Sequence, residues 1–142
     1  MTEAQLSAAL KAHIIAEVLN AVVIKHADAY TAGTPDLSES WGGMTSWLEV
    51  KYLNPSLTDD PRQQFLIRKM ARATFCKYVF YLGPKCPPTI WSATELVKTC
   101  IVDPIRLNHD ASNWPNCIIA ASPKKHDHEL VMAYLRDLRS YK

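Results

Sequence analysis

A helix-start signal between two β-patterned segments constrains this fold most. Thr58-Asp59-Asp60-Pro61 places an acidic cap before a proline, as is typical of the first turn of a helix. The segment before it, residues 45–53, alternates side chains with the period of a strand, and residues 75–82 are aromatic and rich in strand-forming residues. We therefore expect a helix over residues 61–73 between two strands, with Phe65, Leu66, Met70 and Ala73 pointing inward. This order favours a mixed α/β layer arrangement with a central sheet.

The flanking segments extend this pattern. Residues 3 to about 25 repeat apolar side chains every three or four positions, which predicts a long first helix, although residues 21–24 could also begin a strand. Residues 84–116 contain five of the nine prolines and are expected to be irregular, with a short strand near 89–91 and a short helix at 93–99. A last strand is expected at 117–121, followed by a C-terminal helix that turns Arg136 and Arg139 towards water.

The chain should form one domain. It has 142 residues, 48% of them hydrophobic, which suffices for a single core but not for two comfortable ones. Residues 3–83 are expected to form the main α/β unit. Residues 84–142 would complete the sheet and add the irregular segment and the last helix.

Charge is distributed unevenly around a net value of +2. Residues 1–61 contain eight acidic and three basic side chains, and residues 62–142 contain thirteen basic and six acidic ones. An acidic half beside a basic half suits a site that holds a cation next to a surface that attracts a polyanion. Chance clustering in a short chain is the alternative.

The sequence contains no secretory or membrane signal. It has no signal peptide pattern at its N-terminus and no apolar run of about 18 residues, so no membrane partner is expected. The four cysteines form no C-x-x-C pair, and their spacing to His109 or to the 126–128 histidines matches no usual zinc pattern. A reducing cytoplasm is therefore the expected location.

Two acidic residues and a lysine make up the candidate chemistry. Glu49 and Lys51 are two positions apart in the expected strand, so their side chains share one face, about 7 Å apart. The turn at residues 38–43 should fold Asp36 back beside them. Two carboxylates and the backbone carbonyl of Val50 are hard oxygen ligands that suit Mg²⁺, and a lysine can orient or deprotonate an attacking water. An ordinary solvated ion pair between Glu49 and Lys51 is the alternative.

These motifs resemble a known family. Gly33-Thr34-Pro35-Asp36-Leu37, followed by Ser46-Trp47-Leu48-Glu49-Val50-Lys51, resembles the PD-(D/E)XK nuclease superfamily. The closer resemblance is to its small branch of VRR-NUC domains, phage nucleases and Holliday-junction resolvases. It covers residues 3 to about 83. It implies a restriction-endonuclease-like fold and a phage or bacterial source.

The resemblance also implies roles for individual residues. Asp36 and Glu49 would bind Mg²⁺ or Mn²⁺, Lys51 would be the catalytic lysine, and Gln63 or Gln64 would be the glutamine of the following helix. A glutamate of the first helix often completes such sites, and Glu17 is preferred here over Glu3 because the first residues of a chain tend to fray. The substrate would be DNA, including branched or recombination intermediates, and a resolvase would need a homodimer.

Basic and aromatic residues near this site are candidates for DNA contact. In a nuclease these basic side chains could bind phosphates, while on an amphipathic helix they could equally be the solvent-exposed face. Trp41 could stack on an unpaired base, or it could be a hydrophobic lid. The basic residues are Arg62, Arg68, Lys69, Arg72, Lys77 and Lys85.

Two other functions remain open at this stage. The chain could be a non-catalytic nucleic-acid-binding or assembly protein that keeps the nuclease fold, in which case its DNA affinity would not depend on metal. It could also be a host-interaction protein that acts through residues 84–121.

Overall fold

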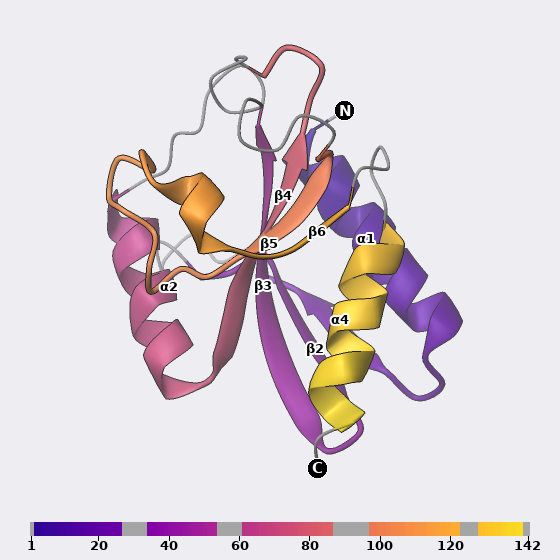
Figure 1. Ribbon diagram of the computed structural model, residues 1–142. Helices are drawn as coiled ribbons and strands as arrows, with labels where there is room; N and C mark the ends of the chain where they lie inside the picture. Colours follow the sequence, from indigo (N-terminus) through magenta and orange to yellow (C-terminus); the bar gives the residue numbers. More distant parts are fainter. Residues whose placement is uncertain (1, 27–33, 54–60, 87–96, 123–127, 141–142) are drawn as a thin grey trace.

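The computed structural model describes residues 2–26, 34–53, 61–86, 97–122 and 128–140. These residues form an α/β fold, with a mixed sheet and helices on its faces, as the sequence predicts (Figure 1). The elements in chain order are α1 (Glu3–Glu17), β1 (Val22–Lys25), β2 (Leu37–Trp41), β3 (Met44–Leu53), α2 (Pro61–Ala73), β4 (Phe75–Leu82), β5 (Thr99–Val102), the 3-10 helix η1 (Trp114–Cys117), β6 (Ile118–Ser122) and α4 (His128–Ser140).

The six strands lie in sequence order across the sheet, from β1 to β6. Among the strands that the structure describes, only the central pair, β3 and β4, is parallel, and the other neighbours are antiparallel. A parallel pair needs a crossover connection, and α2 provides it. The helix-start signal at residue 61 therefore predicts the crossover that lets β4 run in the same direction as β3.

The helices divide between the two faces of the sheet. The buried side chains of α1 and α4 form one core cluster with Leu48 and Val50 of β3. The buried Ile67 of α2 belongs to a second cluster with β4, β5 and η1. Because strand side chains alternate between faces, Glu49 and Lys51 lie on the α2 face.

A two-residue turn joins β2 to β3. The turn expected over residues 38–43 is therefore shorter than predicted, because residues 38–41 pair with β3 as part of β2. Trp41 pairs with Met44, and Gly42 and Gly43 between them have φ angles of 60° and 74°. This positive-φ pair is typical of the tight hairpin turns that match strand twist. A Cβ on Gly42 would also lie 3.4 Å from the Cδ of Arg139, so the turn packs directly under α4.

The first helix is shorter than its apolar pattern predicts. It begins with a capping box in which Thr2 and Gln5 exchange hydrogen bonds, and it ends at Glu17. Asn20 has a φ of 64°, and Val22–Lys25 then form β1 against β2. The helix prediction to residue 25 is wrong, and the strand alternative is correct. β-branched residues here gain more from pairing at the sheet than from helix propagation.

The buried faces of α2 and α4 differ from those expected from the sequence. Gln64 and Ile67 are the buried residues of α2, and Phe65, expected to point inward, is 71% exposed. On α4, Arg139 is buried instead of facing water. Thr99, placed in a short helix by its sequence, belongs to β5. The short strand expected at 89–91 lies outside the described residues.

Hydrophobic length gives no sign of a membrane span. None of the helices among the described residues is both long enough and apolar enough to cross a bilayer.

Candidate functional site

Asp36 and Glu49 meet where β2 begins, beside the middle of β3. Continuing the register of Leu37 with Leu48 by one step places Asp36 opposite Glu49. The Val50 N–H donates to Asp36 Oδ2 at 3.0 Å, and the Asp36 N–H donates to Glu49 Oε1 at 3.2 Å. The two carboxylates are therefore linked through the backbone of both strands. The period of β3 and the hairpin turn produce the juxtaposition that the sequence predicts.

Lys51 lies beside this acidic pair. Its Nζ is 3.9 Å from Glu49 Oε2 and donates to Gln63 Oε1 at 2.8 Å. Gln63 comes from the first turn of α2, so the helix on this face closes the group. Lys51 is 13% exposed and Glu49 1%, which leaves the lysine as the more accessible of the two. Asp36 is partly buried.

Cys76, on the neighbouring strand β4, has a raised pKa. Burial raises the pKa of Cys76 to about 12, and the charge of Glu49 adds to this increase. A thiol with so high a pKa remains protonated near neutral pH, so Cys76 is not a nucleophile here. It packs in the core cluster on the α2 face.

The oxygen donors at this end of the hairpin suit a hard divalent cation. A strand residue directs its N–H and its C=O to the same edge, so the Val50 carbonyl faces Asp36 as its N–H does. Asp36, Glu49 and this carbonyl form a set that Mg²⁺ could use while keeping several waters. Among the described residues, no group of three or more Asp, Glu, His or Cys side chains could hold a metal. The set therefore contains two carboxylates and one carbonyl.

The structure places Glu17 away from these residues. Glu17 Oε2 is 3.0 Å from the Arg136 guanidinium on α4, and its other oxygen is 3.2 Å from His13 Nε2. Both contacts lie on the α1 and α4 side of the sheet, opposite Glu49. The prediction that Glu17 completes the site is not supported by this geometry. Glu3 is exposed in the first turn of α1.

The basic residues predicted to contact nucleic acid have different environments. Arg62, Lys69 and Arg72 are exposed on α2. Arg68 is partly buried and donates to the backbone carbonyls of Pro104 (3.3 Å) and Leu107. Lys77 lies 3.8 Å from Asp103 and over the Phe75 ring. Arg68 and Lys77 therefore have structural contacts of their own.

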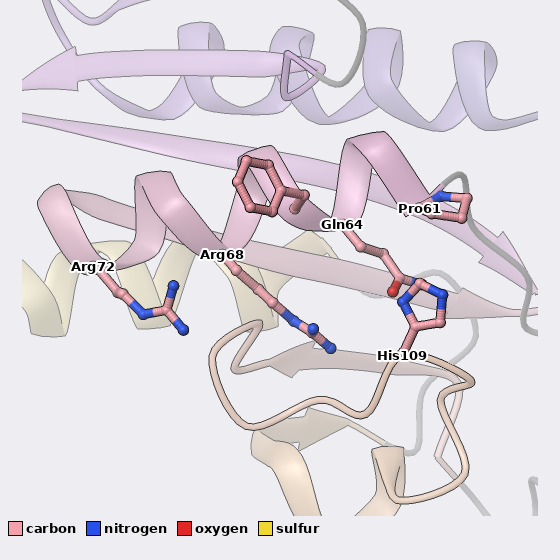
Figure 2. A pocket seen from close by; sticks show the side chains of 6 residues that line it. Pro61, Gln64, Arg68, Arg72 and His109 are labelled. Atoms are coloured by element: carbon pink, nitrogen blue, oxygen red, sulfur yellow. The ribbon is translucent and has the colours of Figure 1, made fainter.

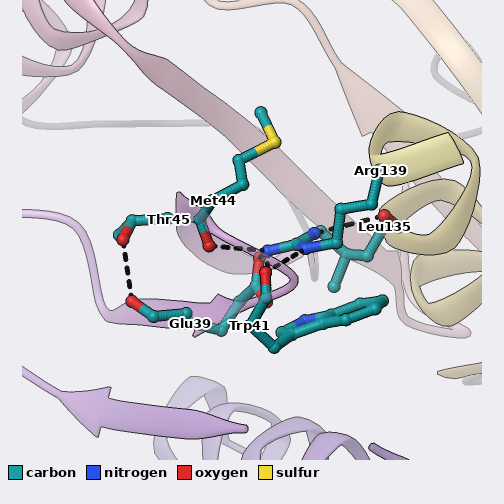
Figure 3. A network of polar contacts seen from close by, with 7 residues as sticks. Glu39, Trp41, Met44, Thr45, Leu135 and Arg139 are labelled. Atoms are coloured by element: carbon teal, nitrogen blue, oxygen red, sulfur yellow. Dashed lines mark hydrogen bonds and ion pairs between the residues drawn. The ribbon is translucent and has the colours of Figure 1, made fainter. Parts of the chain in front are cut away.

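Trp41 is packed under the C-terminal helix. Its ring lies 4.0 Å from the Arg139 guanidinium carbon, and its carbonyl accepts from Arg139 Nε at 2.9 Å (Figure 3). The same guanidinium donates to both oxygens of Glu39, at 2.8 and 2.9 Å. This geometry favours the lid interpretation of Trp41 over base stacking.

Sequence reasoning missed the contacts of His26 and named Gln64 only as the alternative to Gln63. The His26 ring stacks on Trp47 with ring centroids 4.9 Å apart, and its Nε2 is hydrogen-bonded to Ser38 Oγ at 2.8 Å. The backbone N–H of His26 donates to the carbonyl of Asp36. Gln64 is 5% exposed, and its Oε1 has no hydrogen-bond partner among the described residues. The polar position of Gln64 within an amphipathic helix is the one sequence signal, and by itself it is ambiguous.

Comparison with known proteins adds no assignment. No family model matches the chain, and no curated protein matches it.

Proposed function

We propose that this protein is a metal-dependent nuclease that hydrolyses DNA phosphodiester bonds. The observation that carries the proposal is the linked pair of carboxylates, Asp36 and Glu49, with the Lys51 ammonium 3.9 Å from one of them. A buried glutamate that has a lysine and a second acid beside it is a costly arrangement for a purely structural ion pair. A role in catalysis accounts for the cost.

Each residue has a defined task in this proposal. Asp36, Glu49 and the Val50 carbonyl would hold Mg²⁺ or Mn²⁺. When bound, the ion would polarise the phosphate and lower the pKa of a water bound to it. Lys51 would orient the attacking water or stabilise negative charge on the phosphate. Gln63 accepts from Lys51 Nζ and so positions it. Branched or recombination intermediates are the DNA class that the family resemblance suggests.

The most direct test of the proposal is whether cleavage needs the negative charge of Asp36. Asp36→Asn keeps an oxygen that can accept from the Val50 N–H, so the hairpin should remain folded while one negative charge is lost. We expect cleavage to fall by about 100-fold or more, because a metal contributes several kcal/mol to such reactions. Asp110→Asn, at an exposed loop position, is the matched control and should keep full activity.

The assay uses supercoiled, linear, single-stranded, flapped and four-way DNA with Mg²⁺, Mn²⁺ or EDTA. Activity should need a divalent ion and disappear in Asp36→Asn and Lys51→Met. A protein-only measurement accompanies it: Mg²⁺ or Mn²⁺ should raise the melting temperature of the wild type but not of Asp36→Asn. Cleavage by Asp36→Asn at the wild-type rate would refute the proposal.

A second candidate is a DNA-binding protein that keeps this fold without catalysis. The observation that favours it is the small number of acidic ligands: among the described residues, only two carboxylates and no third metal-holding side chain gather at the site. Such a protein would bind DNA with strong salt dependence, and neither EDTA nor Asp36→Asn would change its affinity.

A further inference from the structure

A pocket of about 340 Å³ lies between α2 and the chain segment that carries His109. It is lined by the first three turns of that helix and by His109 from the loop between β5 and η1 (Figure 2). A volume of this size is in the range of small-ligand sites. The lining residues are Pro61, Gln64, Phe65, Arg68, Arg72 and His109.

The chemistry of the lining is positive and aromatic. Arg68 and Arg72 are one helical turn apart, so their guanidinium groups project on the same side of α2. None of the lining residues is acidic. The nearby carboxylates are engaged elsewhere, since Asp103 lies 3.8 Å from Lys77 and Asp110 accepts from the Ser112 N–H at 3.0 Å. The pocket therefore favours an anion.

One buried group in the pocket lacks a partner. The Oε1 of Gln64 is without a hydrogen bond among the described residues, although the side chain is only 5% exposed. Buried acceptors are normally satisfied, and an exception calls for an explanation. A ligand that brings an N–H into the pocket would provide one. Figure 2 shows Gln64 directed towards His109, at the pocket end nearest Pro61.

Phe65 supplies a flat apolar surface next to the two arginines. It is 71% exposed, which is unusual for a phenylalanine on a helix that packs against a sheet. Exposed aromatic rings beside guanidinium groups are what single-stranded nucleic acids use, with bases stacked on the rings and phosphates held by the cations. An acidic peptide would use the arginines but would leave the ring and the Gln64 acceptor without a role.

We propose that this pocket binds one nucleotide of a nucleic-acid strand. Arg72 and Arg68 hold its phosphate, Phe65 stacks on its base, and Gln64 Oε1 accepts a hydrogen bond from a base N–H. Arg68 has a second task, because its bonds to the Pro104 and Leu107 carbonyls pin the loop that carries His109. Gln63 and Gln64 are consecutive, so a strand held here would lead into the site at Lys51. This path, but not the binding itself, depends on the proposed nuclease function.

The test measures binding in EDTA, where no cleavage occurs. A short fluorescein-labelled single-stranded DNA is titrated with the full chain, and anisotropy reports the affinity. We expect Arg72→Ala and Phe65→Ala each to weaken binding about tenfold, and Arg72→Ala to lower the salt dependence by about one ion. Lys69→Ala, an exposed cation of the same helix outside the pocket lining, and Ile119→Ala, an exposed apolar residue of β6, should change affinity less than about twofold.

Competition with unlabelled dAMP identifies the source of the nucleotide. If dAMP displaces the labelled DNA only at concentrations far above that of the oligonucleotide, the pocket binds a nucleotide within a strand. If dAMP displaces the labelled DNA at comparable concentrations, the pocket is instead a site for a free nucleotide with the same chemistry. Binding by both pocket variants that equals their controls would overturn the proposal. Loss in Arg72→Ala alone would also overturn it, because only a phosphate contact without stacking would remain.

The result is separable from the nuclease proposal. Pocket-dependent binding by a protein that never cleaves DNA leaves this inference standing while the nuclease proposal fails. Metal-dependent cleavage that is lost in Asp36→Asn, together with unaltered binding by the pocket variants, supports the nuclease proposal and overturns the pocket inference.

Discussion

Replacing Arg139 by methionine should destabilise the protein strongly. The side chain is 8% exposed, and its guanidinium donates to both oxygens of Glu39, which is fully buried, and to the Trp41 carbonyl (Figure 3). Methionine keeps an apolar stem against Trp41 but leaves the carboxylate without its counter-ion. Removing one partner of a buried ion pair costs about 3–5 kcal/mol, a large part of the roughly 5–15 kcal/mol that stabilises a typical domain.

Urea unfolding followed by tryptophan fluorescence and circular dichroism measures this loss. At roughly 3 °C per kcal/mol for a chain of this size, the melting temperature should also fall by about 10 °C. Arg136→Met is the matched control on the same helix. Its ion pair with Glu17 is exposed and should contribute no more than about 1 kcal/mol. Equal losses in the two variants would refute the argument from burial.

A second replacement separates charge from packing. Glu39→Leu combined with Arg139→Met removes both charges, so the double variant should be more stable than Arg139→Met alone. If the double variant were instead as unstable as the sum of the two single variants, the two side chains would not interact and the pair would not be the cause.

The effect of Arg139→Met should depend on pH. Burial raises the pKa of Glu39 above its ordinary 4.5, against the opposing effect of Arg139. Removing Arg139 leaves burial less opposed, so the pKa of Glu39 rises further in the variant. When the folded pKa of an acid is higher than the unfolded one, stability falls as pH rises through that interval. The loss caused by the substitution should therefore shrink as pH is lowered towards 4.5.

Two further outcomes follow from burial. Ile67→Ala, at a fully buried position, should cost about 2–5 kcal/mol in urea unfolding, whereas Phe65→Ala on the exposed side of the same helix should stay within about 0.5 kcal/mol; similar losses at both would contradict the assigned helix face. Burial raises the pKa of both Cys76 and Cys100, so these thiols should resist iodoacetamide at pH 8 and become labelled only on unfolding, and rapid labelling of the native protein would contradict their placement.

The main elements and the acidic pair were predictable because they depend on local signals. A period of two residues places Glu49 and Lys51 on one face whatever the rest of the fold does, and the two glycines fix the hairpin that returns Asp36 to them. These features need only the register of neighbouring segments. The family resemblance left Gln63 and Gln64 as alternatives, and the contact of Gln63 with Lys51 distinguishes them only in the structure.

The remaining features depend on how distant elements pack. Glu17 could not be placed from sequence, because its environment is set by α4, which docks on α1 from the other end of the chain. The buried position of Arg139 has the same origin, since a guanidinium near the end of an amphipathic helix normally faces solvent. Phe65 was misassigned because hydrophobicity alone does not tell which side of α2 meets the sheet.

The Gly42-Gly43 turn has a role that extends the full length of the hairpin. It lies at the opposite end of β2 and β3 from Asp36 and Glu49, yet its two-residue length sets which side chains of β3 point to which side. One extra residue there would rotate every later position of the strand by half a repeat and send Glu49 and Lys51 to the α1 side. The spacing of the acids is thus dictated by a turn that never touches them.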